Sequence, residues 1–108
     1  MTRYLLNSAV IPAGAAGTWR YMVVDPSFAR LWLLVGPFVS RIGYPENARL
    51  LQDLAGVPVA VDRSEHAMRP GDQALVMRLR YRVEGLKGGL KVDLADFEFG
   101  ILDYLRSN

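Results

Sequence analysis

The most constraining feature of the sequence is the alternating segment Ala74–Val83. Side chains of a strand point to opposite faces with a period of two, so this segment predicts a strand with two distinct faces. One face carries Leu75, Met77, Leu79, Tyr81 and Val83. The other carries Ala74, Val76, Arg78, Arg80 and Arg82. We therefore expect a long strand that is apolar on one side and cationic over part of the other.

The remaining elements follow from local start and stop signals. Asp25 followed by Pro26 predicts the start of a helix that ends near Gly36-Pro37 and carries an apolar series at helical spacing, Phe28, Leu31, Trp32 and Val35. A second helix is predicted from Pro45 to about Ala55, with Gly56 ending it and a buried stripe of Ala48, Leu51, Leu54 and Ala55. Further extended segments are expected at Arg3–Ser8, Thr18–Val24, Phe38–Ile42, Val57–Val61 and Phe97–Leu102.

About five strands and two helices, interleaved in the first half and rich in strands in the second, predict an α/β fold of the mixed α+β kind. We expect a mainly mixed sheet of about five strands. A chain of 108 residues has the length of one domain, so residues 1–108 are predicted to form a single small domain.

Composition excludes several classes of site. The chain has no Cys and one His, His66. It therefore has no disulfide framework, no thiol nucleophile and no Cys- or His-cluster metal site, and we expect neither metal nor cofactor. The longest apolar run, Leu31–Val39, is far shorter than the roughly 20 residues of a membrane helix, which predicts a cytoplasmic protein with no membrane partner.

The net charge is ordinary, but the basic residues are almost all arginine. The net charge is only +2, but 11 of the 13 basic residues are Arg. Genome base composition or a heat-adapted source explains this bias, and so does the binding of planar anions such as phosphate, which Arg grips better than Lys. The row of Arg78, Arg80 and Arg82 also has two interpretations. It is either a phosphate-binding row or a solvated strand face.

Two other places suggest a ligand site. Asn7 and Ser8 end the first strand, Gly43 and Tyr44 precede the second helix, and helix N-termini bind anions. Each is also compatible with an ordinary turn or helix start. His66 titrates near neutral pH, but a lone His is more often incidental than catalytic.

Taken in order, a series of short motifs covers nearly the whole chain. They are Leu5–Val10, Ser40–Tyr44, Leu54–Val57, Val61–Arg63, Pro70–Asp72, Ala74–Arg82, Glu84-Gly85 and Phe97–Leu102. This series resembles the viral ring nuclease family, the type III anti-CRISPR proteins of archaeal viruses and their bacterial, phage and plasmid relatives.

The resemblance implies a homodimer built around a ligand cleft. It implies that the ligand is cyclic tetra-adenylate, and that a ribose 2′-hydroxyl attacks the neighbouring phosphate without a metal. The products are linear di-adenylates with a 2′,3′-cyclic phosphate, and the loss of the messenger switches off type III CRISPR signalling. No duplex nucleic acid is expected as a partner.

Site residues follow from the same resemblance. The family's Arg and Glu after the long strand correspond to Arg82 and Glu84, which the resemblance implies are catalytic. Asn7, Ser8, Gly43, Arg63 and Arg80 are implied to bind the ligand.

The main departure is Tyr44, which occupies the position of the family's general-acid His. A phenol with an ordinary pKa near 10 can still protonate a leaving oxygen, but it needs tuning to match imidazole near pH 7. Tyr44 is therefore interpreted as a weak acid, as a residue that stacks on adenine, or as a mark of lost catalysis. The alternatives to a ring nuclease are a sponge or sensor that holds a cyclic nucleotide uncut, and a protein-interaction domain that kept only the fold.

Overall fold

The computed structural model describes residues 1–9, 11, 16–65, 67–80 and 93–107. Its elements follow in the order β1 (Arg3–Leu6), β2 (Gly17–Val24), α1 (Pro26–Leu34), β3 (Val39–Ser40), α2 (Pro45–Ala55), β4 (Gln73–Leu79), the 3-10 turn η1 (Leu94–Asp96) and β5 (Phe97–Ser107). The predicted class, a mixed α+β domain with two helices, is confirmed.

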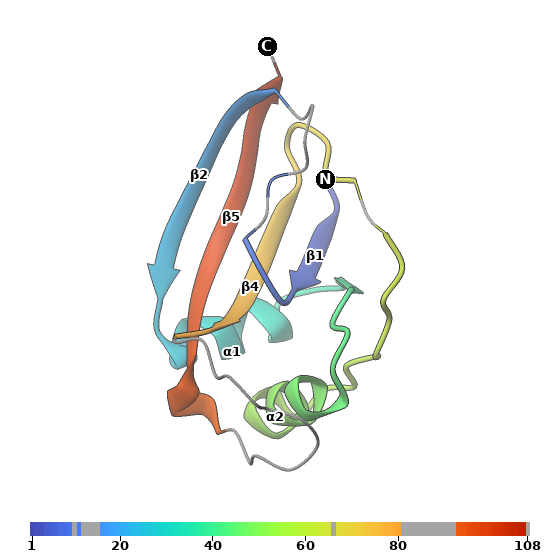
Figure 1. The fold of residues 1–108 in the computed structure, drawn as a ribbon, viewed down its shortest axis with the longest axis vertical. Coiled ribbons are helices and arrows are strands. Elements are labelled where there is room, and N and C mark those ends of the chain that lie inside the picture. Colours follow the sequence, from blue (N-terminus) through green and yellow to red (C-terminus); the bar gives the residue numbers. More distant parts are fainter. Residues whose placement is uncertain (10, 12–15, 66, 81–92, 108) are drawn as a thin grey trace.

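The strands form one five-stranded sheet in the order β2-β5-β4-β1-β3. β1 runs parallel to both β3 and β4, whereas β5 is antiparallel to β4 and β2. Figure 1 shows β1 and β4 ending at the same end of the sheet, beside α1 and α2. The predicted mixed sheet is therefore confirmed, and its helices lie near the carboxyl ends of the parallel strands.

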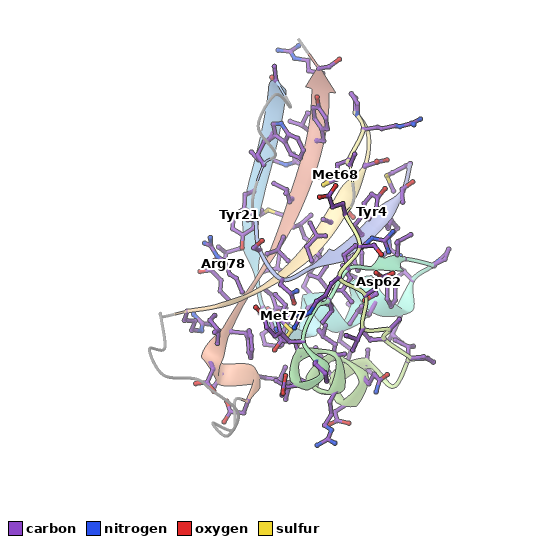
Figure 2. The ribbon with its side chains drawn as sticks, turned by 45° about the vertical axis from the view of Figure 1, so that its right-hand side comes forward. Tyr4, Tyr21, Asp62, Met68, Met77 and Arg78 are labelled. Carbon is purple, nitrogen blue, oxygen red and sulfur yellow. The ribbon has the colours of Figure 1, made fainter. Side chains whose placement is uncertain are left out.

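Both faces of the sheet are covered, which is why β4 is buried along most of its length. Leu75 and Met77 face the helices, and Ala74 and Val76 belong to a second, smaller cluster on the opposite face. In Figure 2 Met77 lies beside the helices, while Tyr4 lies beside Met68, which packs with it against the second cluster. The alternation predicted for this strand is confirmed from Ala74 to Arg78, but β4 ends at the exposed Leu79, so the described Arg80 lies beyond the strand that was predicted to include it. The predicted continuation at 81–83 lies outside the described residues.

Local signals placed both helices correctly. The Asp25 side chain accepts a hydrogen bond from the Phe28 N–H at 2.8 Å, as a helix cap should. α2 spans the predicted residues and ends at Gly56, which adopts the left-handed conformation with φ 71°. Such signals act within a few residues of the chain, so the sequence alone was sufficient for them.

The predicted apolar series of α1 does not face the core. Phe28, Leu31 and Val35 are 46%, 56% and 73% exposed, and Ala29, Trp32 and Leu33 are the buried residues. Residues 31–35 are all apolar, so two different stripes match helical spacing. The packing of α1 against the sheet selects the stripe that contains Ala29.

The predicted strand at Val57–Val61 is wrong. The segment makes a single parallel bridge, between Val61 and Ile42. Pro58 has no N–H for a ladder, the Val59 N–H donates to the Gln52 side chain, and the Ser40 hydroxyl donates to the Ala60 carbonyl. Side chains therefore satisfy the backbone groups that a neighbouring strand would otherwise bind.

Smaller differences concern the ends of strands. β1 ends at Leu6, two residues before the predicted end, and β3 covers only Val39–Ser40 of the predicted Phe38–Ile42. β5 continues to Ser107 instead of ending near Leu102. The reason for the extension is pairing, because β2 provides a partner for β5 as far as Gly17 opposite Ser107.

Candidate functional site

The candidate site lies where β1 ends and α2 begins. Asn7 and Ser8 directly follow β1, and Gly43 and Tyr44 lie between the parallel neighbour β3 and the first residue of α2. Asn7 is half-buried and Ser8 is exposed. In open sheets with parallel strands, ligands commonly bind outside the carboxyl ends of such strands.

Arg63 joins this site from a distant segment. The bridge between Ile42 and Val61, with the Asp62 N–H donating to the Ile42 carbonyl at 2.8 Å, holds its segment against the chain before α2. The Arg63 Nε then donates to the Gly43 carbonyl at 2.8 Å. Its guanidinium carbon lies 5.2 Å from the centre of the Tyr44 ring, within cation–π range.

The charge of Arg63 is not neutralised by any carboxylate among the described residues. Its neighbour Asp62 forms an ion pair with Arg41 at 3.1 Å. Hydrogen bonds from the side chain and backbone of Ser64, with a further contribution from Arg41, hold the pKa of Asp62 below its ordinary value. In the described part of the chain no carboxylate pairs with Arg63. A cation with one remaining exposed side is suited to binding an anion.

The N-terminus of α2 adds backbone donors. Tyr44 is the N-cap residue, and its side chain makes no capping hydrogen bond, in contrast to Asp25 at α1. Pro45 has no N–H, and the intrahelical ladder begins with the Ala48 N–H on the Tyr44 carbonyl at 3.2 Å. The N–H groups of Glu46 and Asn47 therefore have no side-chain cap, although the exposed Glu46 carboxylate offsets part of their attraction for anions.

Gly43 is a glycine because its neighbours need the space. A Cβ on Gly43 would lie 3.1 Å from the Arg63 Cγ, 3.4 Å from the Arg63 Nε and 3.5 Å from the Asn7 Nδ2. Arg63 and Asn7 thus converge on the same point beside the Gly43 backbone. An added methyl group would push back the Arg63 stem, whose Cγ cannot yield as the end of a side chain can.

Asn47 is a site residue that the sequence reasoning missed. Its side chain is buried, and its Nδ2 donates to the Oδ1 of Asn7 at 3.4 Å. The signal was available, because Asn47 lies four residues before Leu51 and next to Ala48, both on the buried stripe of α2. A polar residue on an apolar stripe marks a specific contact.

Tyr44 presents its ring to solvent. The side chain is 53% exposed, and within the described ranges its hydroxyl has no hydrogen-bond partner. The ring contacts the Arg63 guanidinium, and its exposed part is accessible to a ligand.

Two arginines of the predicted row, Arg78 and Arg80, lie among the described residues, and both contact protein groups outside the candidate site. The Arg78 Nε and Nη2 donate to the Glu98 Oε1 at 2.9 and 2.6 Å, and its guanidinium lies 5.0 Å from the Tyr21 ring, beside it in Figure 2. Arg80 donates through Nε to the Ala95 carbonyl at 3.2 Å, so its described contact is to η1 and not to the Tyr44 cluster. These contacts favour a surface face over a phosphate-binding row for Arg78.

The pKa values of the two partners of Arg78 are shifted in opposite directions. The hydrogen bond from Arg78 lowers the pKa of Glu98, and burial raises the pKa of Tyr21, whose hydroxyl donates to Glu98 at 3.3 Å. Glu98 is therefore an ionised acceptor and Tyr21 a neutral donor. The three residues form a closed group that gives no indication of a ligand.

The structure brings four of the predicted site residues together: Asn7, Gly43, Tyr44 and Arg63. Arg82, Glu84 and His66 lie outside the described residues. No cluster of three or more His, Asp or Glu side chains suited to a metal occurs in the part of the chain that the structure describes. Within the same part, neither helix is long and apolar enough to span a membrane.

Comparisons with known proteins agree with this architecture. A family model described as STIV B116-like matches residues 3–100. The solved structure of B116 of Sulfolobus turreted icosahedral virus superposes with a TM-score of 0.73 at 20% sequence identity, covering 95% of this chain and 99% of that one. At this identity the superposition shows a shared fold. No curated protein matches the sequence.

Proposed function

The chain belongs to the STIV B116-like family, and from that membership and the cluster around Arg63 we propose that it binds a cyclic oligoadenylate, cyclic tetra-adenylate above others, and cleaves it without a metal. The family match confirms the resemblance to viral ring nucleases that the motif order indicated. Cleavage of this messenger in the cytoplasm would switch off type III CRISPR signalling.

One observation carries the proposal. Three segments far apart in sequence place the Asn7 amide, the Arg63 guanidinium and the uncapped N-terminus of α2 around one point beside Gly43. All three are hydrogen-bond donors with positive or partly positive charge, and a phosphodiester is an anion with several acceptor oxygens. The site is thus complementary to a nucleotide phosphate.

The proposed reaction is an internal transfer. The ribose 2′-oxygen attacks the neighbouring phosphorus, the bond from phosphorus to the 5′-oxygen breaks, and a 2′,3′-cyclic phosphate remains. Glu84 accepts the proton of the 2′-hydroxyl, Arg82 balances the charge that develops on the phosphate, and Tyr44 gives a proton to the leaving 5′-oxygen. Ser8 and Arg80 complete the ligand contacts.

The cyclic ligand has twofold symmetry, and a single chain offers one such donor cluster. We therefore propose a homodimer that binds one cyclic tetra-adenylate across its twofold axis. Calorimetry checks this directly, because the expected stoichiometry is one ligand per two chains.

A metal-free cleavage assay tests the enzyme proposal. The protein is incubated with cyclic tetra-adenylate in EDTA, and linear di-adenylates ending in a cyclic phosphate are the expected products. Arg63→Ala should weaken binding about 10- to 100-fold, the equivalent of one charge-assisted hydrogen bond. Arg49→Ala is the matched control, because Arg49 is an exposed arginine on α2 outside the cluster. Intact ligand after many hours with excess protein contradicts cleavage.

A second candidate is a protein that holds the cyclic nucleotide without cutting it. Tyr44 favours it, because a phenol replaces the family's imidazole and its exposed ring offers a stacking surface for adenine. Tyr44→Phe separates the two candidates. A general-acid role predicts a large loss of turnover with unchanged affinity, whereas a stacking role predicts that neither quantity changes. Tight binding of an uncleaved ring by the wild-type protein supports the second candidate.

A further inference from the structure

Asn47 makes an inward contact that the helix itself does not need. It is the third residue of α2, and its side chain is 9% exposed. A short polar side chain in a first turn usually faces solvent or binds the free end of the helix. The amide of Asn47 instead donates to Asn7, 40 residues earlier in the chain. A buried amide is disfavoured unless it is hydrogen-bonded, so this contact requires a reason beyond helix formation.

The contact fixes the direction of the Asn7 amide. A side-chain amide has an oxygen acceptor at one end and an NH2 donor at the other. Because the Oδ1 of Asn7 accepts from Asn47, its Nδ2 lies on the opposite side. That side faces Gly43, where the Nδ2 is 3.5 Å from the position of an added Cβ and the Arg63 Nε is 3.4 Å from the same position.

Without Asn47, the two orientations of the Asn7 amide would differ little in their protein contacts. One orientation would present an NH2 group beside Arg63, and the other would present an oxygen that repels a phosphate. An amide that alternates between the two binds an anion more weakly than one held in the donor orientation, because the ligand must select part of the population.

We propose that Asn47 is a positioning residue that holds Asn7 with its NH2 group toward the ligand, so that this point of the site recognises a phosphodiester oxygen. The inference rests on the proposed binding of a cyclic oligoadenylate and adds a specificity determinant to it. Asn47 touches the ligand through no side-chain atom; it acts through Asn7.

A double-mutant cycle tests the proposal. Asn47→Leu keeps the branched shape of the side chain, suits a buried helix position and removes the donor. We expect it to weaken cyclic tetra-adenylate binding about tenfold, measured by calorimetry, without lowering the melting temperature. In an Asn7→Ala background the same substitution should have no further effect on affinity, because the group that Asn47 positions is absent. An equal loss in both backgrounds overturns the proposal.

A variant that turns the donor at position 47 into an acceptor sharpens the result. Asn47→Asp can only accept, so Asn7 should turn its NH2 inward and present its oxygen to the ligand. The added negative charge suits a helix N-terminus, and we therefore expect a higher melting temperature together with weaker binding. Glu46→Gln measures the effect of one charge in the same first turn. If Asn47→Asp lowers the affinity for the ligand by no more than Glu46→Gln raises it, charge alone explains the effect. That result contradicts the positioning role.

A measurement without ligand separates this proposal from the proposed function. In NMR spectra of the 15N-labelled protein, the Asn7 side-chain NH2 should be rigid in the wild type and mobile in Asn47→Leu. If Asn7 is equally rigid in both proteins, the positioning proposal fails whatever the protein binds. If the amide responds as expected but no cyclic oligoadenylate binds, positioning stands and the proposed function fails.

Discussion

Gly100 is a position at which one added methyl group should disturb the packing of the sheet. It lies in β5, and its neighbour across the face is the ring of Tyr21 from β2. A Cβ at Gly100 would lie 2.2 Å from the Tyr21 Cζ and 2.3 Å from its hydroxyl oxygen. Carbon atoms in contact are about 3.5–4.0 Å apart, so the ring must move by more than 1 Å.

The cost follows from what the ring loses. Overpacking of this kind costs about 1–3 kcal/mol when the neighbours stay and strain. A ring that leaves instead gives up the contact with Arg78, about 0.5–1 kcal/mol, and the hydrogen bond to Glu98, about 1 kcal/mol. Both routes give about 2 kcal/mol for Gly100→Ala. With an unfolding entropy of about 2.1 cal/mol/K per residue, this lowers the melting temperature of a chain of 108 residues by about 9 °C.

Thermal unfolding followed by circular dichroism measures this shift. Gly36→Ala is the matched control, because its added Cβ meets only the Arg3 guanidinium at 3.4 Å and its φ is not positive. We expect a change of less than about 0.5 kcal/mol there. In a Tyr21→Ala background Gly100→Ala should become neutral or stabilising. A full 9 °C loss in that background, or no loss in the wild type, refutes the reasoning.

Three further predictions concern single residues. Because Arg78 holds the pKa of Glu98 below its ordinary 4.5, the stability that this carboxylate adds is full above that value and is lost as pH falls through the lowered pKa. The melting temperature should therefore fall less steeply in acid for Glu98→Gln than for the control Glu65→Gln, and equal slopes contradict this. Asp25→Ala removes the cap of α1 and should cost about 1 kcal/mol in urea unfolding, against no change for Asp53→Ala. Arg63→Lys keeps the charge but loses the planar fork; it should bind cyclic tetra-adenylate more weakly than the wild type and more tightly than Arg63→Ala, and wild-type affinity would show that charge alone is required.

Much of the fold was predictable because its signals are local. Asp25 and Pro26 at one helix, and Pro45 and Gly56 at the other, act through backbone angles and hydrogen bonds within one turn. The alternation in β4 is also local, since it follows from the pleat of a single strand. These features needed no knowledge of the partner elements.

The errors arose where a partner decides the outcome. α1 offers two apolar stripes, and its contacts with α2 and the sheet determine that Trp32 is buried and Leu31 is exposed. The segment before Val61 has the pattern of a strand, but its hydrogen bonds go to the side chains of Gln52 and Ser40. The length of β5 depends on β2, which extends beside it to Gly17.

The candidate site shows the same division. The sequence alone indicated the family, which the family match confirms, and it named Asn7, Gly43, Tyr44 and Arg63, which the structure brings together. The sequence left two interpretations open for Arg78, and only tertiary structure showed that Glu98 neutralises it, whereas Arg63 has no carboxylate partner among the described residues. It also gave Asn47 no role. Distances between segments 20 to 40 residues apart are set by packing, and packing decides which charge is available and which amide is held.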